Sequence, residues 1–225
     1  MTRAVGALLR KELRLELRTP QVIPAMALFS VTTLVVFHFS LQRNAVEGDL
    51  AAGVLTVTLL FSAMLGINRL FVADQEEGGF DGFLLAPVDR TAMLVAKALS
   101  LGAFLVVLEL IAVPAFGLLL LDPALSAGTI GKAAVVLALA DVGIAVVGTL
   151  VGALAIQTRA RDLIVPLIAL PLLLPVVIGT AKALSPALAA AGAGALPGRW
   201  LAIVGLYDLV FALLAYAVFD FLLED

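Results

Sequence analysis

Six long apolar runs decide what this chain can fold into. Each is long enough for a helix to cross the hydrocarbon core of a bilayer, which takes about 20 residues. The runs are continuous rather than alternating, which favours helices over barrel strands. They lie at about residues 22–41, 50–71, 92–121, 129–156, 163–184 and 200–223. We therefore predict an all-α integral membrane protein, with six transmembrane helices in a single domain, 1–225.

The composition supports this class and excludes others. Hydrophobic residues make up 63% of the chain and charged residues 14%, whereas soluble domains carry about 25% charged residues. The chain has no cysteine, which excludes disulfides, thiolate catalysis and iron–sulfur ligation. A net charge of −3 without a soluble basic domain argues against nucleic acid as a partner. No catalytic set and no metal-ligand spacing is found, so we predict neither an enzyme nor a metal site.

The basic residues predict the orientation in the membrane. An even number of spans puts both termini on one side. With the N-terminus inside, four of the 14 Lys and Arg residues fall outside: Arg43, Lys132, Lys182 and Arg199. The other ten fall inside, five of them in the leucine-rich segment 1–20, which we expect to form an amphipathic helix on the cytoplasmic surface. Both termini are therefore predicted to be cytoplasmic.

The inner segment 74–90 follows the second span and begins DQEEGGFDGFLLAP. After an acidic start, two phenylalanines and a leucine fall at i, i+3 and i+4, which form one face of a short helix that can lie in a partner's groove. The glycines weaken such a helix, so an ordinary solvated loop is the alternative. The residues of the predicted docking element are Asp74, Glu76, Glu77, Gly78, Phe80, Asp81, Phe83, Leu84 and Pro87.

The same segment resembles the heme exporter protein B family (CcmB), the ABC-2-type permease subunit of the cytochrome c maturation transporter. Gly79, Phe80 and Asp81 depart from that family's usual small hydroxyl, Leu and Glu. A second stretch, LPLLLPVVIG at 170–179, resembles the family's proline-bearing fifth span, and the six-span layout also matches. The residues that fit the first motif are Arg69, Asp74, Gly78, Leu84, Leu85, Pro87 and Lys97.

The resemblance implies a transporter subunit rather than an enzyme. It implies a separate ATPase subunit (CcmA-like) that binds ATP and docks at 74–90, with heme as the cargo or release of a heme chaperone as the task. It also implies a heme-handling CcmC-like membrane protein, a small single-span CcmD-like subunit and two sets of permease spans in the cell (inner) membrane. This chain itself is expected to bind no cofactor. The alternatives are an ABC-2-type export permease for a drug, lipid or glycan, and a membrane scaffold without transport.

Three carboxylates interrupt the apolar spans. Glu109 and Asp141 are predicted near mid-membrane and Asp208 nearer the outer face. Acids within a membrane are costly and usually face a cavity or a partner. They are therefore a candidate intramembrane path, the alternative being protonated acids hydrogen-bonded between helices.

The remaining features concern helix shape and packing. Pro166, Pro171 and Pro175 lie in the fifth span, where each removes a backbone hydrogen bond, so the span is either flexible or discontinuous, or has a static kink. The pair Gly148 and Gly152 is a small-residue packing motif. His38, the only histidine, is expected to be an interfacial residue rather than an axial heme ligand.

Overall fold

The computed structural model describes residues 2–41, 45–71, 90–122, 125–155, 158, 160–189 and 194–222. These residues contain no strand, and a 3₁₀ turn at Ser185–Leu188 follows one of the helices. Six helices are long and apolar enough to cross a membrane, which confirms the predicted fold class. The helices are α1 (Thr2–Arg18), α2 (Val22–Ser40), α3 (Gly48–Arg69), α6 (Arg90–Leu120), α7 (Ala127–Ala155), α8 (Arg161–Leu184) and α9 (Gly198–Leu222).

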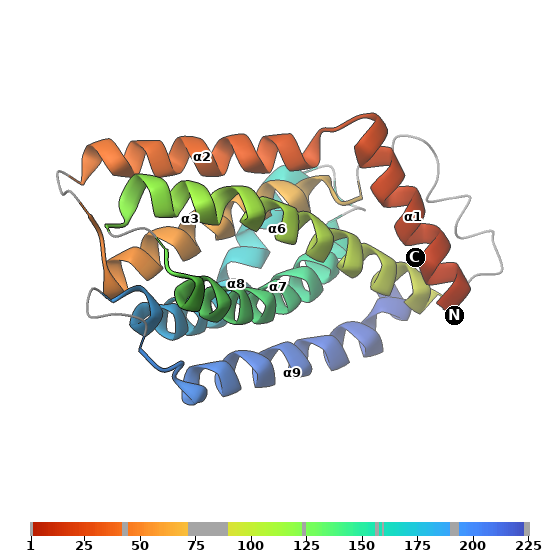
Figure 1. The fold of residues 1–225 in the computed structure, drawn as a ribbon. Helices are drawn as coiled ribbons and strands as arrows, with labels where there is room; N and C mark the ends of the chain where they lie inside the picture. The colour runs from red at the N-terminus through yellow and green to blue at the C-terminus, as the bar shows by residue number, and fades with distance from the viewer. Residues whose placement is uncertain are drawn as a thin grey trace.

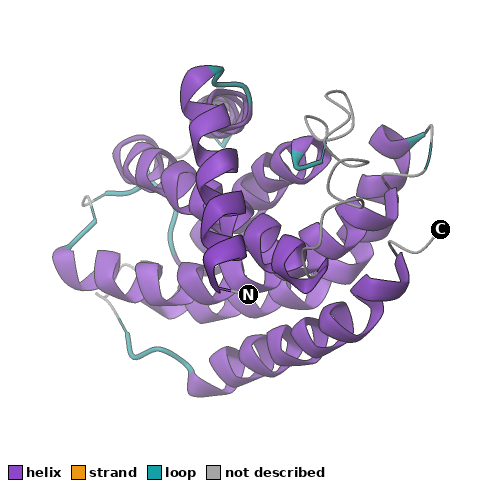
Figure 2. Ribbon diagram, turned by 90° about the vertical axis from the view of Figure 1, so that its right-hand side faces the viewer, coloured by secondary structure: helices purple, strands orange, loops and turns teal. Residues whose placement is uncertain are grey.

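Helices α2 to α9 run side by side, and α1 lies across one end of them (Figure 1). The first and last described residues lie at this same end, as six spans require. Figure 2 looks onto this end, with α1 crossing in front of the bundle. Leu8 and Leu13 of α1 pack against the core, while its basic residues are exposed. The predicted amphipathic N-terminal helix is therefore present and belongs to the fold.

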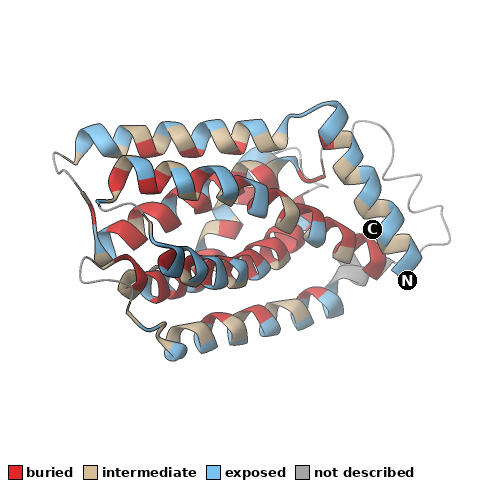
Figure 3. Cartoon of the chain, in the orientation of Figure 1, coloured by how far each residue is buried: buried red, intermediate tan, exposed pale blue. Residues whose placement is uncertain are grey.

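The central helices α3 and α7 are the most buried of the six spans. Buried residues make up 72% and 67% of their most apolar stretches, compared with 17% in α2 and 17% in α9. Figure 3 shows α2 and α9 at the two edges, with exposed residues along their outer sides. Most of those exposed side chains are apolar, as expected of a lipid-facing surface.

Helix α7 approaches α3 closely because of its glycines. A Cβ atom on Gly148 would lie 2.7 Å from Ile67 Cγ1, and one on Gly152 would lie 3.0 Å from the ring of Phe71. The predicted packing role of these two glycines is therefore confirmed. Ser126 precedes α7, and its Oγ accepts the backbone N–H of Thr129 at 3.1 Å, which caps the helix N-terminus.

Helix α8 runs unbroken from Arg161 to Leu184 with Pro166, Pro171 and Pro175 inside it. The discontinuous alternative is therefore wrong for this structure. The Tyr207 hydroxyl of α9 donates to the backbone carbonyl of Leu172 within this stretch, which holds α9 against α8.

Candidate functional site

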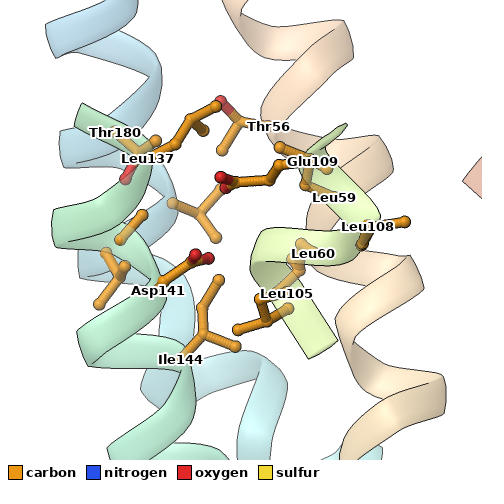
Figure 4. A pocket seen from close by; sticks show the side chains of 13 residues that line it. Thr56, Leu59, Leu60, Leu105, Leu108, Glu109, Leu137, Asp141, Ile144 and Thr180 are labelled. Atoms are coloured by element: carbon orange, nitrogen blue, oxygen red, sulfur yellow. The ribbon is translucent and has the colours of Figure 1, made fainter. Parts of the chain in front are cut away.

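The centre of the bundle contains a small cavity with a mostly apolar wall. Its volume is about 20 Å³, and it lies among α3, α6, α7 and α8. Each of these helices contributes one polar side chain to its wall, together with leucines and other apolar residues. Figure 4 shows the carboxyl groups of Glu109 and Asp141 pointing toward each other across the cavity. The polar lining residues are Thr56, Glu109, Asp141 and Thr180.

The sequence analysis left open whether Glu109 and Asp141 line a path or are protonated acids hydrogen-bonded between helices, and the structure places both in the wall of this cavity. The two carboxyl groups face each other in the interior of the bundle (Figure 4). Two like charges so close together in a low-dielectric interior repel each other strongly, so at least one carboxyl group keeps its proton. The pair therefore carries at most one negative charge.

Three of the polar atoms at this cavity have no hydrogen-bond partner among the described residues: Asp141 Oδ2, Thr56 Oγ1 and Thr180 Oγ1. Their residues are only 7%, 5% and 2% exposed, respectively. Unpaired buried polar atoms are rare in folded proteins, and each calls for an explanation. Thr56 and Thr180 had no signal in the sequence, since threonine is ordinary in a membrane helix.

Four other buried hydroxyls in these spans behave differently. Each donates to the backbone carbonyl four residues earlier, the usual arrangement for Ser and Thr inside a helix. The donors are Thr58, Ser62, Ser100 and Thr149, at 2.7–2.8 Å. The unpaired hydroxyls of Thr56 and Thr180 therefore differ from these four. Unpaired buried oxygens also occur away from the cavity, at Asn68 Oδ1 and at both carboxyl oxygens of Asp208.

Asp208 lies outside this cavity and at a different depth from the one predicted. Its carboxyl packs on Gly143 of α7, where a Cβ atom would lie 2.3 Å from Asp208 Oδ1. Gly143 is two residues from Asp141, so Asp208 lies at mid-membrane rather than nearer the outer face. The cause is the start of α9 at Gly198, which puts Asp208 about 15 Å along its helix. Two residues along a helix turn about 200°, so Asp208 and Asp141 lie on opposite sides of α7.

Two larger grooves meet at the carboxyl pair. One, of about 500 Å³, lies among α6, α7 and α9 and extends to Thr91, near the end crossed by α1. The other, of about 580 Å³, lies between α6 and α7 and extends to Leu125, near the opposite end. Asp141 lines both grooves and Glu109 lines the second. The pair can therefore be approached from either half of the membrane.

A second polar cluster lies at the end crossed by α1. Lys97 of α6 is 3% exposed. Its Nζ donates to the Leu70 carbonyl at 2.8 Å and lies 3.0 Å from Glu12 Oε1. The ammonium also lies 5.2 Å from the centre of the Phe71 ring. Lys97 therefore ties together α1, the end of α3 and the start of α6.

Hydrogen bonds hold the turn between α1 and α2 in place at this end of the bundle. Glu16 is buried and accepts the backbone N–H groups of Gln21, Val22 and Ile23 at 2.8–3.2 Å. A carboxylate in this position satisfies the unpaired donors of a helix N-terminus and complements its dipole. Arg69 Nη1 donates to Gln21 Oε1 at 2.9 Å. We call Glu12, Glu16, Gln21, Arg69 and Lys97 the α1 anchor.

The predicted docking element lies outside the described residues, which end at Phe71 and resume at Arg90. Its residues Asp74, Glu76, Glu77, Gly78, Phe80, Asp81, Phe83, Leu84 and Pro87 therefore stay predictions. The α1 anchor lies where this segment leaves α3 and joins α6. His38 is exposed, and its Nδ1 hydrogen-bonds the Leu119 carbonyl of α6, an arrangement that fits an interfacial residue.

Comparison with known proteins identifies the family. The family model for CcmB protein matches residues 3–221. Heme exporter protein B of Rhodobacter capsulatus is 32% identical over 174 residues, which cover 76% of this chain and 78% of that protein. Heme exporter protein B of Bradyrhizobium diazoefficiens is 28% identical and covers 78% of each chain. The protein of the same name from Pseudomonas aeruginosa is 26% identical, covering 84% and 83%. This chain therefore belongs to the CcmB protein family.

Proposed function

We propose that this chain is the membrane-spanning permease subunit of an ABC transporter for heme export or cytochrome c maturation. The observation that carries the proposal is the family match, which extends over 3–221 and hence over all six spans. The relatives named above are heme exporters by name. In this role the chain is a transporter subunit, and a separate CcmA-like subunit hydrolyses ATP.

The ATPase docks on the segment 74–87, at the end of the bundle crossed by α1. The α1 anchor supports this place for it, because Lys97 joins α1, α3 and α6 where that segment begins and ends. A movement of the segment would be transmitted to α1, α3 and α6, which these contacts hold together. Movement would then pass along α3 and α6, both of which reach the central cavity.

The cargo is heme, or the task is the release of a heme chaperone. The central cavity of about 20 Å³ has room for one water-sized molecule, so heme would have to pass elsewhere or be carried by partners. Those partners are a CcmC-like heme-handling protein and a CcmD-like single-span subunit, with two sets of permease spans in the inner membrane.

A charge on the apolar face of the segment 74–87 tests whether the ATPase docks there. Phe83→Asp places a charge on the apolar face of the proposed element, and we expect it to reduce co-purification of the ATPase at least tenfold and to abolish c-type cytochrome formation. Phe83→Leu keeps the face apolar and is the matched control. Both variants should insert into the membrane in normal amounts. Unchanged co-purification of Phe83→Asp with the ATPase would refute docking through this face.

Cysteine labelling tests the orientation, because the natural chain has no cysteine. Ser126 precedes α7 at the end of the bundle opposite α1. We expect a membrane-impermeant thiol reagent to label Ser126→Cys in intact cells and to label Gly79→Cys only after the cells are opened. Labelling of Gly79→Cys in intact cells would reverse the topology and remove the ATPase-docking proposal.

A further inference from the structure

We propose that the outward face of α1 binds the headgroups of anionic phospholipids, through a row of Arg10, Arg14 and Arg18 with Leu17 beside it. The inference concerns the membrane around this chain, so it does not depend on the cargo or on the ATPase. It follows from how the charges of α1 are divided between its faces, from an exposed leucine and from where the helix meets the bilayer.

The acidic and basic residues of α1 lie on opposite faces. At about 100° per residue, Arg10, Arg14 and Arg18 fall within about 80° of each other, and all three are exposed. Glu12 and Glu16 lie on the other side of the helix, where both take part in the α1 anchor. The outward face of α1 therefore carries positive charges and no carboxylate.

The guanidinium groups of this row are available to a ligand. The three arginines have no hydrogen-bond or ion-pair partner among the described residues. A guanidinium presents five N–H donors in a fixed fork that matches the oxygens of a phosphate group. Successive arginines are four residues and about 6 Å apart along the helix. The row can therefore contact the phosphates of neighbouring lipids.

An exposed leucine on the same face indicates lipid rather than a soluble partner. Leu17 is 81% exposed, more than the lipid-facing Leu28 of α2 at 71%. Helix periodicity puts its side chain next to those of Arg14 and Arg18. Basic residues with an apolar side chain among them are typical of helices that lie in the headgroup region, where the apolar group reaches the acyl chains.

The place of α1 brings this face to the membrane surface. Helix α1 ends at Arg18, and the span α2 begins at Val22, so this end of α1 lies at the level where α2 enters the bilayer. Helix α2 is at the edge of the bundle (Figure 3), and lipid therefore surrounds the site. Basic clusters next to a transmembrane helix attract anionic headgroups.

The test uses the full chain in phosphatidylcholine nanodiscs that contain a spin-labelled quencher lipid, either phosphatidylglycerol or phosphatidylcholine. The natural chain has no cysteine, so Thr19→Cys places a single fluorophore beside the row. At low salt, we expect the association constant of phosphatidylglycerol, measured by quenching, to exceed that of phosphatidylcholine about fivefold or more. In about 1 M NaCl, which screens charges beyond about 3 Å, this preference should disappear.

Arginine variants locate the site. The triple variant Arg10→Gln, Arg14→Gln, Arg18→Gln should lose the preference for phosphatidylglycerol. The corresponding triple lysine variant keeps the charge and should retain most of it. Arg199→Gln removes an exposed arginine at the opposite end of the bundle and should leave the preference unchanged. All the substituted side chains are exposed, so we expect the denaturation midpoint to stay that of the natural chain, and the salt titration of that chain needs no variant.

The proposal is wrong if the two lipids quench the natural chain equally. It is also wrong if the glutamine variant keeps its preference, and loss of the ATPase from that variant would then assign the outward face to protein docking. A loss of preference in the lysine variant or in Arg199→Gln as complete as in the glutamine variant would contradict the proposal as well.

Discussion

The α1 anchor and the central cavity both bury charged side chains, and they differ in how those side chains are satisfied. In the anchor, the Lys97 ammonium has a carboxylate, a backbone carbonyl and an aromatic ring around it, and Glu16 accepts three N–H groups. In the cavity, three buried oxygen atoms have no partner among the described residues. A satisfied cluster holds elements together, whereas unpaired buried polar atoms cost stability.

One helix connects the two regions. Lys97 and Glu109 both lie on α6, twelve residues and about 18 Å apart. Helix α3 also reaches both, through Arg69 at its end and Thr56 at its middle. A displacement of the anchor therefore has a direct route to the helices that line the cavity. The anchor and the cavity are connected because they share two helices, α3 and α6. The coupling energy between the two regions has to be measured.

Breaking the anchor should have the largest effect on stability. Lys97→Met removes the cation beside Glu12, which is only 11% exposed in its side chain, and leaves the Leu70 carbonyl without this donor. Glu12 then keeps a 3.7 Å contact with the exposed Lys11. We expect a loss of about 3 kcal/mol, as when one partner of a buried ion pair is removed. Detergent-denaturation curves of the purified protein measure it.

Two further variants control this prediction. Lys97→Met combined with Glu12→Leu removes both charges, and should recover most of the loss because an apolar pair can replace a buried ion pair. Lys182→Met breaks the pair with Asp49, whose side chains are 48% and 70% exposed, and should change stability little. An equal loss in Lys97→Met and Lys182→Met would contradict the view that the anchor holds the fold.

Overpacking beside Asp208 should have an intermediate effect. In Gly143→Ala, the new methyl group would lie 2.3 Å from Asp208 Oδ1 and 3.0 Å from Val176 Cγ2, so α7 and α9 must separate slightly. We expect a cost of about 1–3 kcal/mol. Gly131→Ala on the same helix has no atom within 4 Å of the added Cβ and should be neutral or slightly stabilising. If Gly143→Ala matches Gly131→Ala in its denaturation midpoint, Asp208 is not tightly held against α7.

The sequence predicted the spans well because apolar length is a local property. The predicted span 50–71 corresponds to α3 (Gly48–Arg69), and 163–184 falls within α8. The meeting of Glu109 with Asp141 was not predictable to the same degree. It depends on how α6 and α7 are rotated and shifted against each other, and close contacts such as that of Gly148 with Leu101 fix this register.

Other parts of the site depend on partners that are distant in sequence. Glu12 and Lys97 are 85 positions apart, and only folding brings them to 3.0 Å. Thr56 and Thr180 became candidates because their hydroxyls lack the backbone bonds that Thr58 and Thr149 make. Both cases concern side-chain satisfaction, which no pattern of residue types reveals. The depth of Asp208 was mispredicted for a simpler reason, since it rested on where α9 begins.

The smallest expected effect is the sharpest test of the comparison, because its sign should differ from that of the anchor variants. Thr56→Val removes an unpaired buried hydroxyl. We expect it to leave stability unchanged or to raise it by up to about 1 kcal/mol, since an unmade hydrogen bond is costly to keep. Thr149→Val, which loses a 2.7 Å bond to the Ala145 carbonyl, should not become more stable. A Thr56→Val variant that is clearly less stable than the natural chain would mean that this hydroxyl has a structural partner and that the cavity resembles the anchor after all.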